Sequence, residues 1–196
     1  MSRRADIART TNETDIRLRL DLDGTAGGGK RATRVGFFDH LLDALARHGA
    51  LELDVSVEGD LETGSHHTVE DTGLALGRAL DQALGDRAGI ARFGEAIVPM
   101  DEARAAAAID VSGRPLLVFE GELAPVTIGG MEADLCEEFL RAVASTAKLT
   151  VHVRIQRGTN PHHMVEVAFK AFARALREAV AIDPRQSGVP STKGVL

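Results

Sequence analysis

The chain has 196 residues, a formal net charge of -6 at pH 7 and an isoelectric point near 5.6. Such an acidic chain argues against a nucleic-acid partner or an anionic membrane surface, because binding to either depends on a basic surface. No apolar stretch is long enough to span a membrane and the polar start lacks the apolar core of a secretory signal, so we expect a cytoplasmic protein.

The first half of the chain alternates between expected strands and helices. Polar and apolar side chains alternate at 16–22, which predicts a strand with one buried face, and the glycine-rich segment after it predicts a turn. Two segments have apolar residues at helical spacing and each ends at a glycine. The expected elements are a strand at 16–22, a turn at 24–29, a strand near 33–35, a helix at 37–48, a strand at 51–57 and a helix at 67–84.

The second half repeats this order. Four consecutive alanines at 105–108 favour a helix on their own, but the segment to which they correspond in the first half alternates strongly and decides for a strand. The tail at 183–196, with Pro184, Gly188 and Pro190, is expected to be irregular and mobile. The expected elements are strands at 93–100, 103–111 and 115–122, a helix at 132–147, a strand at 149–155 and a helix at 163–180.

One short motif occurs twice in the chain. The segment 66–71, HHTVED, returns 96 residues later as 162–167, HHMVEV, and flanking segments follow at the same offset. Internal duplication is the simplest explanation. We therefore predict an α+β fold of two similar halves, residues 1–92 and 93–182, each with a small mixed sheet packed against two helices.

The motif residues are typical metal ligands. In each copy a histidine and a glutamate four residues apart lie nearly above one another on a helix and can share one ion, whereas the second histidine is rotated by roughly 100° and suits another ion. Two further histidines complete two sets of three imidazoles and one carboxylate, which suits manganese, iron, cobalt or zinc. The spacing leaves open whether both copies come from one chain. The candidate ligands are His40, His66, His67, Glu70, His152, His162, His163 and Glu166.

Several basic residues lie close to glycine or within the second motif helix, and these are Arg92, Arg114, Lys170 and Lys193. A phosphate group held at some distance from the metals is a natural partner for them, although each alone could be a solvated surface charge. His48 lies in the last turn of its helix, where a positive ring would complement the helix dipole.

Many of these segments resemble the imidazoleglycerol-phosphate dehydratase family of histidine biosynthesis. The likeness covers almost the whole chain and is carried by 37–43, 66–71, 92–94, 112–115, 160–163, 169–171 and 191–196. It implies a monofunctional hydro-lyase that removes water from D-erythro-imidazole glycerol phosphate to give imidazole acetol phosphate, with two Mn2+ per active site.

The resemblance also implies roles for individual residues. One ion would be held by His66, Glu70, His152 and His163, and the other by His40, His67, His162 and Glu166. Substrate contacts would come from Glu13, His48, Arg92, Arg114, Lys170, Ser191 and Lys193, with Glu13 and His48 as catalytic candidates and Glu13 as the group that transfers a proton. Trimers would build a 24-subunit cage with active sites between subunits, and the tail at 183–196 would close over the substrate.

Three positions depart from the family pattern. Ala44 stands where a glutamine is usual, Ala133 where a threonine is common, and 64–65 where an acidic residue is frequent. They bear on phosphate binding rather than on the reaction. Two other functions compete with the dehydratase: a dinuclear metal phosphoesterase, which would usually bind its ions through bridging carboxylates, and a non-catalytic assembly in which metals only join subunits.

Overall fold

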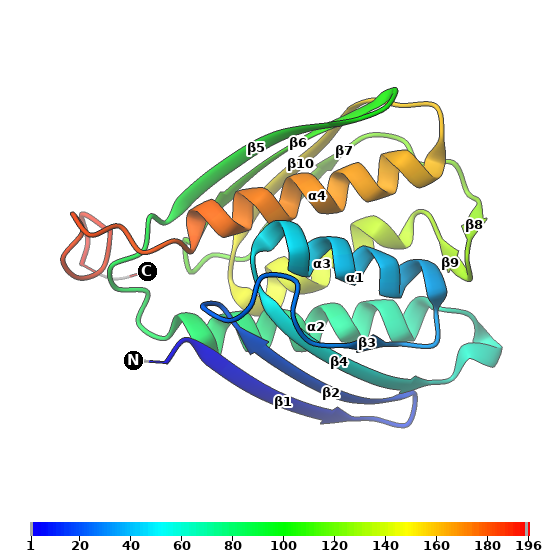
Figure 1. Ribbon diagram of the computed structural model, residues 1–196, viewed down its shortest axis with the longest axis horizontal. Coiled ribbons are helices and arrows are strands. Elements are labelled where there is room, and N and C mark those ends of the chain that lie inside the picture. The colour runs from blue at the N-terminus through cyan, green and yellow to red at the C-terminus, as the bar shows by residue number, and fades with distance from the viewer. Residues whose placement is uncertain (1, 195) are drawn as a thin grey trace.

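The computed structural model describes residues 2–194 and 196 of the chain. In this part, two four-stranded sheets form the outer layers and four helices fill the space between them (Figure 1). None of the helices among the described residues is long and apolar enough to cross a membrane.

The two halves have the same topology. The first sheet has the order β1-β2-β4-β3 and the second β5-β6-β10-β7; in each, the last strand is parallel to its neighbour and the other pairs are antiparallel. The first half contains β1 (Arg4–Thr10), β2 (Thr14–Asp21), β3 (Arg31–Ala32), α1 (Gly36–Gly49), β4 (Glu52–Gly59), the 3-10 turn η1 (Leu61–Thr63) and α2 (His66–Leu84). The second contains β5 (Phe93–Met100), β6 (Ala103–Asp110), β7 (Leu116–Glu120), β8 (Thr127–Ile128), β9 (Met131–Glu132), α3 (Leu135–Ala147), β10 (Thr150–Arg157) and α4 (Pro161–Ala179). The predicted duplicated α+β fold is confirmed.

The helices of one half pack against the helices of the other. α1 lies on α4 and α2 lies on α3, so the hydrophobic core runs across both halves. At its centre the ring of Phe139 on α3 meets Phe38 on α1 and Phe169 on α4, with ring centroids 5.4 and 5.0 Å apart. All three rings are fully buried, and such aromatic pairs add to the stabilisation that burial of their area provides.

Glycines allow α2 and α3 to approach closely. Gly73 and Gly77 lie four residues apart on the face of α2 that meets α3. A methyl group at Gly77 would stand 2.6 Å from the carbonyl oxygen of Val143, and one at Gly73 would stand 2.8 Å from that of Phe139. The helix pair therefore depends on the absence of side chains at these two positions.

One strand was not predicted, and two predicted elements have wrong boundaries. β1 was not expected, because it is an edge strand with Ala5 as its only fully buried side chain and its alternation is weak. The short strand predicted near 33–35 lies two residues earlier, in β3. α3 begins at Leu135 rather than near 132, because Met131 and Glu132 pair with Ile128 and Thr127 in a hairpin.

All four helices begin at one end of the molecule (Figure 1). The turns that join β1 to β2 and β5 to β6 lie at that same end, and both histidine motifs begin there because they open α2 and α4. We call it the motif end. The C-terminal tail and the ends of the helices lie at the opposite end, which we call the tail end.

Candidate active site

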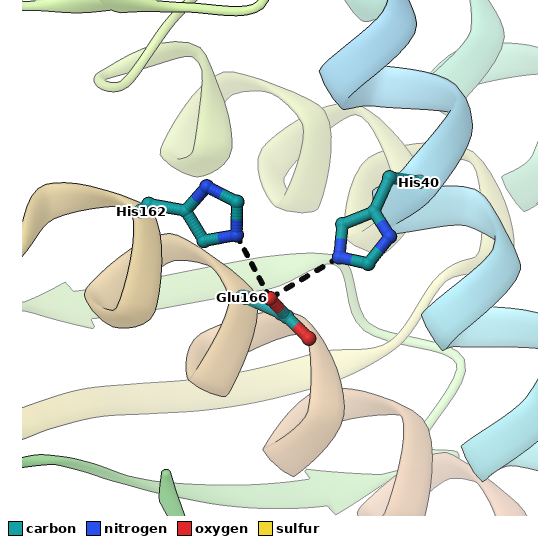
Figure 2. A group of neighbouring side chains, drawn as sticks. All are labelled: His40, His162 and Glu166. Carbon is teal, nitrogen blue, oxygen red and sulfur yellow. Dashed lines mark hydrogen bonds and ion pairs between the residues drawn. The ribbon is translucent and has the colours of Figure 1, made fainter. Parts of the chain in front are cut away.

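Two helices bring three polar side chains together at the motif end. His40 on α1 and His162 on α4 each place Nε2 3.1 Å from Oε2 of Glu166 (Figure 2). One potential ligand atom of each residue lies within 4.8 Å of the other two. Two imidazole nitrogens and a carboxylate oxygen form a donor set that suits manganese, iron or zinc. We call these three residues the α1–α4 cluster.

The start of α4 fixes the position of His162. The Oδ1 atom of Asn160 accepts a hydrogen bond of 3.0 Å from the backbone N–H of His162, and Pro161 occupies the first helical turn. The ring of Phe37, at the start of α1, packs on the imidazole with ring centroids 4.6 Å apart. Glu166 follows one turn later on the same face, so helix geometry aligns it with the ring.

Glu166 is the buried centre of the cluster. Its side chain is 7% exposed, and its second oxygen accepts a hydrogen bond of 2.7 Å from Nζ of Lys170. Burial disfavours the ionised form, but hydrogen bonds from Lys170 and His40 outweigh it and lower the pKa of Glu166 to about 2. The cluster therefore contains an ionised carboxylate that faces two imidazole nitrogens.

The first motif forms a more open group at the start of α2. Nε2 of His66 lies 3.3 Å from Oε2 of Glu70, as the spacing of four residues predicts. The ring of His67 is turned away by 89° and directs Nδ1 to the carboxylate of Asp60 at 3.0 Å. The hydrogen bond with Asp60 raises the pKa of His67. Oε1 of Glu13 lies 3.7 Å from the other ring nitrogen, Nε2.

The second histidine of the other motif, His163, has a comparable environment. Its ring is turned 90° from that of His162 and directs Nδ1 to Oε2 of Glu102 at 2.7 Å. That hydrogen bond, together with two from the backbone at Asn160 and Thr159, lowers the pKa of Glu102 to about 2. The same bond raises the pKa of His163.

Neither predicted ligand set is complete within one chain. Three members of the set His40, His67, His162 and Glu166 converge, and His67 faces Asp60 and Glu13 instead. In the other set, which is His66, Glu70, His152 and His163, only His66 and Glu70 are in contact. His152 lies on β10, opposite Ala108 of β6, and its exposed side chain lines a hollow on the outer face of the second sheet.

Four of the predicted phosphate contacts lie at the tail end. The guanidinium of Arg92 donates to Asp110 at 2.8 and 3.2 Å and to the carbonyl oxygen of Pro190 at 2.8 Å. Arg114 is more exposed and lies 3.5 Å from the same carboxylate of Asp110. In the tail, the backbone N–H of Lys193 donates to Oγ of Ser191 at 3.2 Å. A loop segment and two arginines thus form one basic region.

His48 lies in the last turn of α1, and the charged side chains that act on it include Lys170 and Glu166 of α4. Burial lowers its pKa first, and the positive charges of Lys170 and Arg174 on α4 lower it further. A neutral ring beside two cations offers a nitrogen that can donate to a phosphate oxygen or accept from a hydroxyl.

The two ends are far apart in a single chain (Figure 1). α4 runs from the cluster toward the tail over 19 residues, or about 28 Å at ~1.5 Å per residue. β5 covers a similar path from Arg92 to the turn that contains Glu102, with 8 residues and about 26 Å at ~3.3 Å per residue.

Comparisons with known proteins identify the family. The family model for imidazoleglycerol-phosphate dehydratase matches residues 33–176. The imidazoleglycerol-phosphate dehydratase of Moorella thermoacetica is 55% identical over 196 residues, covering 100% of both chains, and that of Acetivibrio thermocellus is 52% identical over the same length and coverage. The chain belongs to the imidazoleglycerol-phosphate dehydratase family. It is a hydro-lyase of histidine biosynthesis that dehydrates imidazoleglycerol phosphate.

Solved structures of imidazoleglycerol-phosphate dehydratases have the same fold. The enzyme from Staphylococcus aureus superposes with a TM-score of 0.83 at 35% identity, covering 92% of this chain and 99% of its own. The enzyme from Pyrococcus furiosus in complex with (S)-C348 also gives 0.83, at 34% identity, covering 97% of this chain and 100% of its own.

The positions that depart from the dehydratase pattern are partly explained by packing. Ala44 is buried on α1, one turn from His40 and one from His48, so a small side chain lies between these two histidines. Ala133 is fully buried beside the β8–β9 hairpin. Ser65 donates a hydrogen bond of 2.6 Å to Glu132, which joins the start of α2 to that hairpin.

Two carboxylates of the dehydratase site were not anticipated. Glu102 contacts His163 from 61 residues away, and Asp60 contacts His67 from the loop before α2, so helical spacing gives no sign of either carboxylate. The repeat contained one signal, because Glu102 lies 89 residues after Glu13, the offset that relates β2 to β6. Asp39, next to His40 in the chain, accepts hydrogen bonds from the backbone N–H and hydroxyl of Thr33, each at 2.8 Å.

Proposed function

We propose that this dehydratase uses two Mn2+ per active site, held by the eight histidine and glutamate ligands in the two sets given above. The observation that carries the proposal is the α1–α4 cluster, in which two Nε2 atoms converge on an ionised, largely buried carboxylate. Such a donor set fits a divalent ion of the manganese, iron or zinc type. When bound, the ions would act as Lewis acids toward the imidazole ring of the substrate and favour loss of its proton.

The side chains of this enzyme supply the other parts of the reaction. The proton next to the imidazole ring is not made acidic by any carbonyl, so a base needs to be placed close to it. Glu13 is our candidate, because its carboxylate lies at the motif end, is half exposed and faces Nε2 of His67 at 3.7 Å. His48 is the second candidate, as a neutral group beside the phosphate. The phosphate would be held by Arg92, Arg114, Lys170, Ser191 and Lys193, which would fix the ring over the ions.

We further propose that the active sites lie between subunits, in trimers assembled into a 24-subunit cage. The separation between the motif end and the tail end supports this, because one small substrate cannot reach from the α1–α4 cluster, at the start of α4, to the C-terminal tail of the same chain. The outer face of the second sheet also exposes Phe93, Ile97 and Leu116, which are 59%, 66% and 51% exposed. Large apolar side chains gathered on one sheet face are typical of an interaction surface.

Two other functions make different predictions. A dinuclear phosphoesterase would release inorganic phosphate from the substrate and would usually bridge its ions with a carboxylate. In the described part of the chain the cluster contains two imidazoles to one carboxylate, which favours the dehydratase. In the second alternative, the ions only join subunits. Assembly would then require metal, but it would not require Glu13 or Lys170.

The test is turnover by metal-free protein to which Mn2+ is returned, with formation of the ketone product and release of phosphate followed in parallel. We expect product only with Mn2+, no free phosphate, and loss of turnover in Glu13→Gln while both ions still bind. Assembled, Mn2+-loaded protein that forms no ketone would contradict the proposed function. Full activity of Glu13→Gln would contradict only the assignment of the proton-transfer group.

A further inference from the structure

Two glutamates occupy equivalent positions in the two halves. Glu13 lies in the turn between β1 and β2, and Glu102 lies 89 residues later in the turn between β5 and β6. Both turns are at the motif end, and each glutamate approaches the second histidine of one motif, Glu13 toward His67 and Glu102 toward His163. Each half therefore places a turn glutamate near the second histidine of one motif.

The second pair is locked by several hydrogen bonds. Oε2 of Glu102 accepts from Nδ1–H of His163 at 2.7 Å. Oε1 accepts from the backbone N–H of Asn160 at 2.8 Å and from that of Thr159 at 3.1 Å. Both carboxylate oxygens are thus used, and they connect the ring to the loop that leads into α4.

The first pair is arranged differently. The Nδ1 atom of His67 is taken by Asp60, at 3.0 and 3.2 Å from its two carboxylate oxygens. Glu13 faces the opposite ring nitrogen at 3.7 Å, which is beyond hydrogen-bond distance, and among the described residues its carboxylate accepts no hydrogen bond. The turn glutamate of the first half is therefore free, and an aspartate has the place that Glu102 holds in the second half.

We propose that Glu102 and Asp60 are positioning residues that fix the tautomers of His163 and His67. A carboxylate that accepts from Nδ1–H leaves the lone pair on Nε2, which is the atom that then binds a metal ion. Both histidines thus present Nε2 at the motif end. This difference fits the role in proton transfer proposed for Glu13, because among the described residues its carboxylate accepts no hydrogen bond, whereas both oxygens of Glu102 are occupied. The inference rests on the proposed two-metal function.

The substitution Glu102→Gln tests this role sharply. The backbone N–H groups of Asn160 and Thr159 require an oxygen at the position of Oε1, so the amide NH2 of glutamine would face Nδ1 of His163. An NH2 group can only donate there, which favours the tautomer with its proton on Nε2 and blocks the metal-binding atom. Because removing such a partner typically weakens metal binding about 10- to 100-fold, we expect one of the two Mn2+ to bind that much more weakly.

The measurement is Mn2+ stoichiometry and affinity by calorimetry, with free Mn2+ determined by electron paramagnetic resonance. Asp60→Asn is the second variant and should weaken the other ion, whereas Glu62→Gln, on an exposed residue of η1, is the matched control and should bind both ions normally. Glu13→Gln should keep both affinities and lose kcat.

The outcomes separate this inference from the proposed function. Folded, assembled Glu102→Gln and Asp60→Asn proteins that bind both ions with unchanged affinity would overturn the positioning role, even if their stability falls. An unmodified chain that binds no Mn2+ would refute the proposed metal centre itself, and the positioning role with it.

Discussion

The distance between the motif end and the tail end predicts that defects at the two ends complement each other in mixed assemblies. His162→Ala removes an imidazole from the α1–α4 cluster, and Lys193→Ala removes an ammonium group from the tail. Because α4 alone separates these ends by about 28 Å, the two side chains of one chain should serve different active sites. Each variant alone should be nearly inactive, since every site then contains one defective end.

The recovery in a mixture can be worked out from the arrangement. A site is intact only when its motif end comes from a Lys193→Ala subunit and its tail end from a His162→Ala subunit. Random assembly of equal numbers of the two variants should therefore restore roughly one quarter of the wild-type sites. The assay is ketone formation by co-expressed subunits with different tags, purified through both tags and loaded with Mn2+.

The matched control is a mixture of Ser191→Ala subunits and Lys193→Ala subunits, in which both changes lie in the tail. This mixture should not recover, because every tail end remains defective. If the His162 and Lys193 mixture stays as inactive as its parents, or if the control mixture recovers equally, the inference that each site joins the ends of different chains is wrong.

Three other predictions concern stability and charge. Gly77→Ala should lower the free energy of unfolding by about 1–3 kcal/mol, although alanine has the better helix propensity, because the new methyl group would stand 2.6 Å from the carbonyl oxygen of Val143. The control is Gly36→Ala, whose methyl group would meet nothing closer than 3.9 Å. Equal stability of the two variants in urea unfolding would contradict the packing argument. Burial and the charge of Lys170 lower the pKa of His48 in the folded chain, so the unfolded chain binds the proton first as the pH falls. The free energy of unfolding should therefore fall as the pH drops below about 6.5. Urea unfolding on either side of this pH should show a weaker pH dependence in His48→Gln. Removal of bound metal by a chelator should lower the melting temperature, and added Mn2+ should raise it again in proportion to the logarithm of the Mn2+ concentration. A melting temperature that does not change with Mn2+ would argue against a metal site in the folded protein.

Local periodicity and the repeat were sufficient to predict much of this molecule. The spacing of four residues between histidine and glutamate predicted two close pairs, and the structure contains both, at 3.3 Å for His66 and Glu70 and at 3.1 Å for His162 and Glu166. The repeat overruled the helix propensity of the alanines at 105–108, and the strand it favoured is β6. These features depend on residues close in sequence or on a copy elsewhere in the chain.

Other features could not be predicted because they depend on contacts that local periodicity does not describe. Asp60 and Glu102 contact their histidines through turns and loops, and no periodicity relates them. β1 gains its stability from pairing with β2 rather than from its own apolar pattern. The count of histidines indicated His152 as a ligand and the resemblance assigned it to one ion, yet its place on an outer sheet face follows only from the three-dimensional arrangement.

The common direction of the four helices gives the molecule an electrical polarity. Each helix carries roughly half a positive charge at its start and half a negative charge at its end, so the motif end is biased positive and the tail end negative. The carboxylates of Glu13, Asp60, Glu70 and Glu102 oppose the first bias, and Arg92 and Arg114 oppose the second. Two copies that meet with the motif end of one against the tail end of the other bring opposite poles together, whereas copies that meet motif end to motif end bring like poles together. In the proposed assembly, the helix dipoles alone would favour contacts between the motif end of one subunit and the tail end of another, and the association rate should then fall as salt screens these charges.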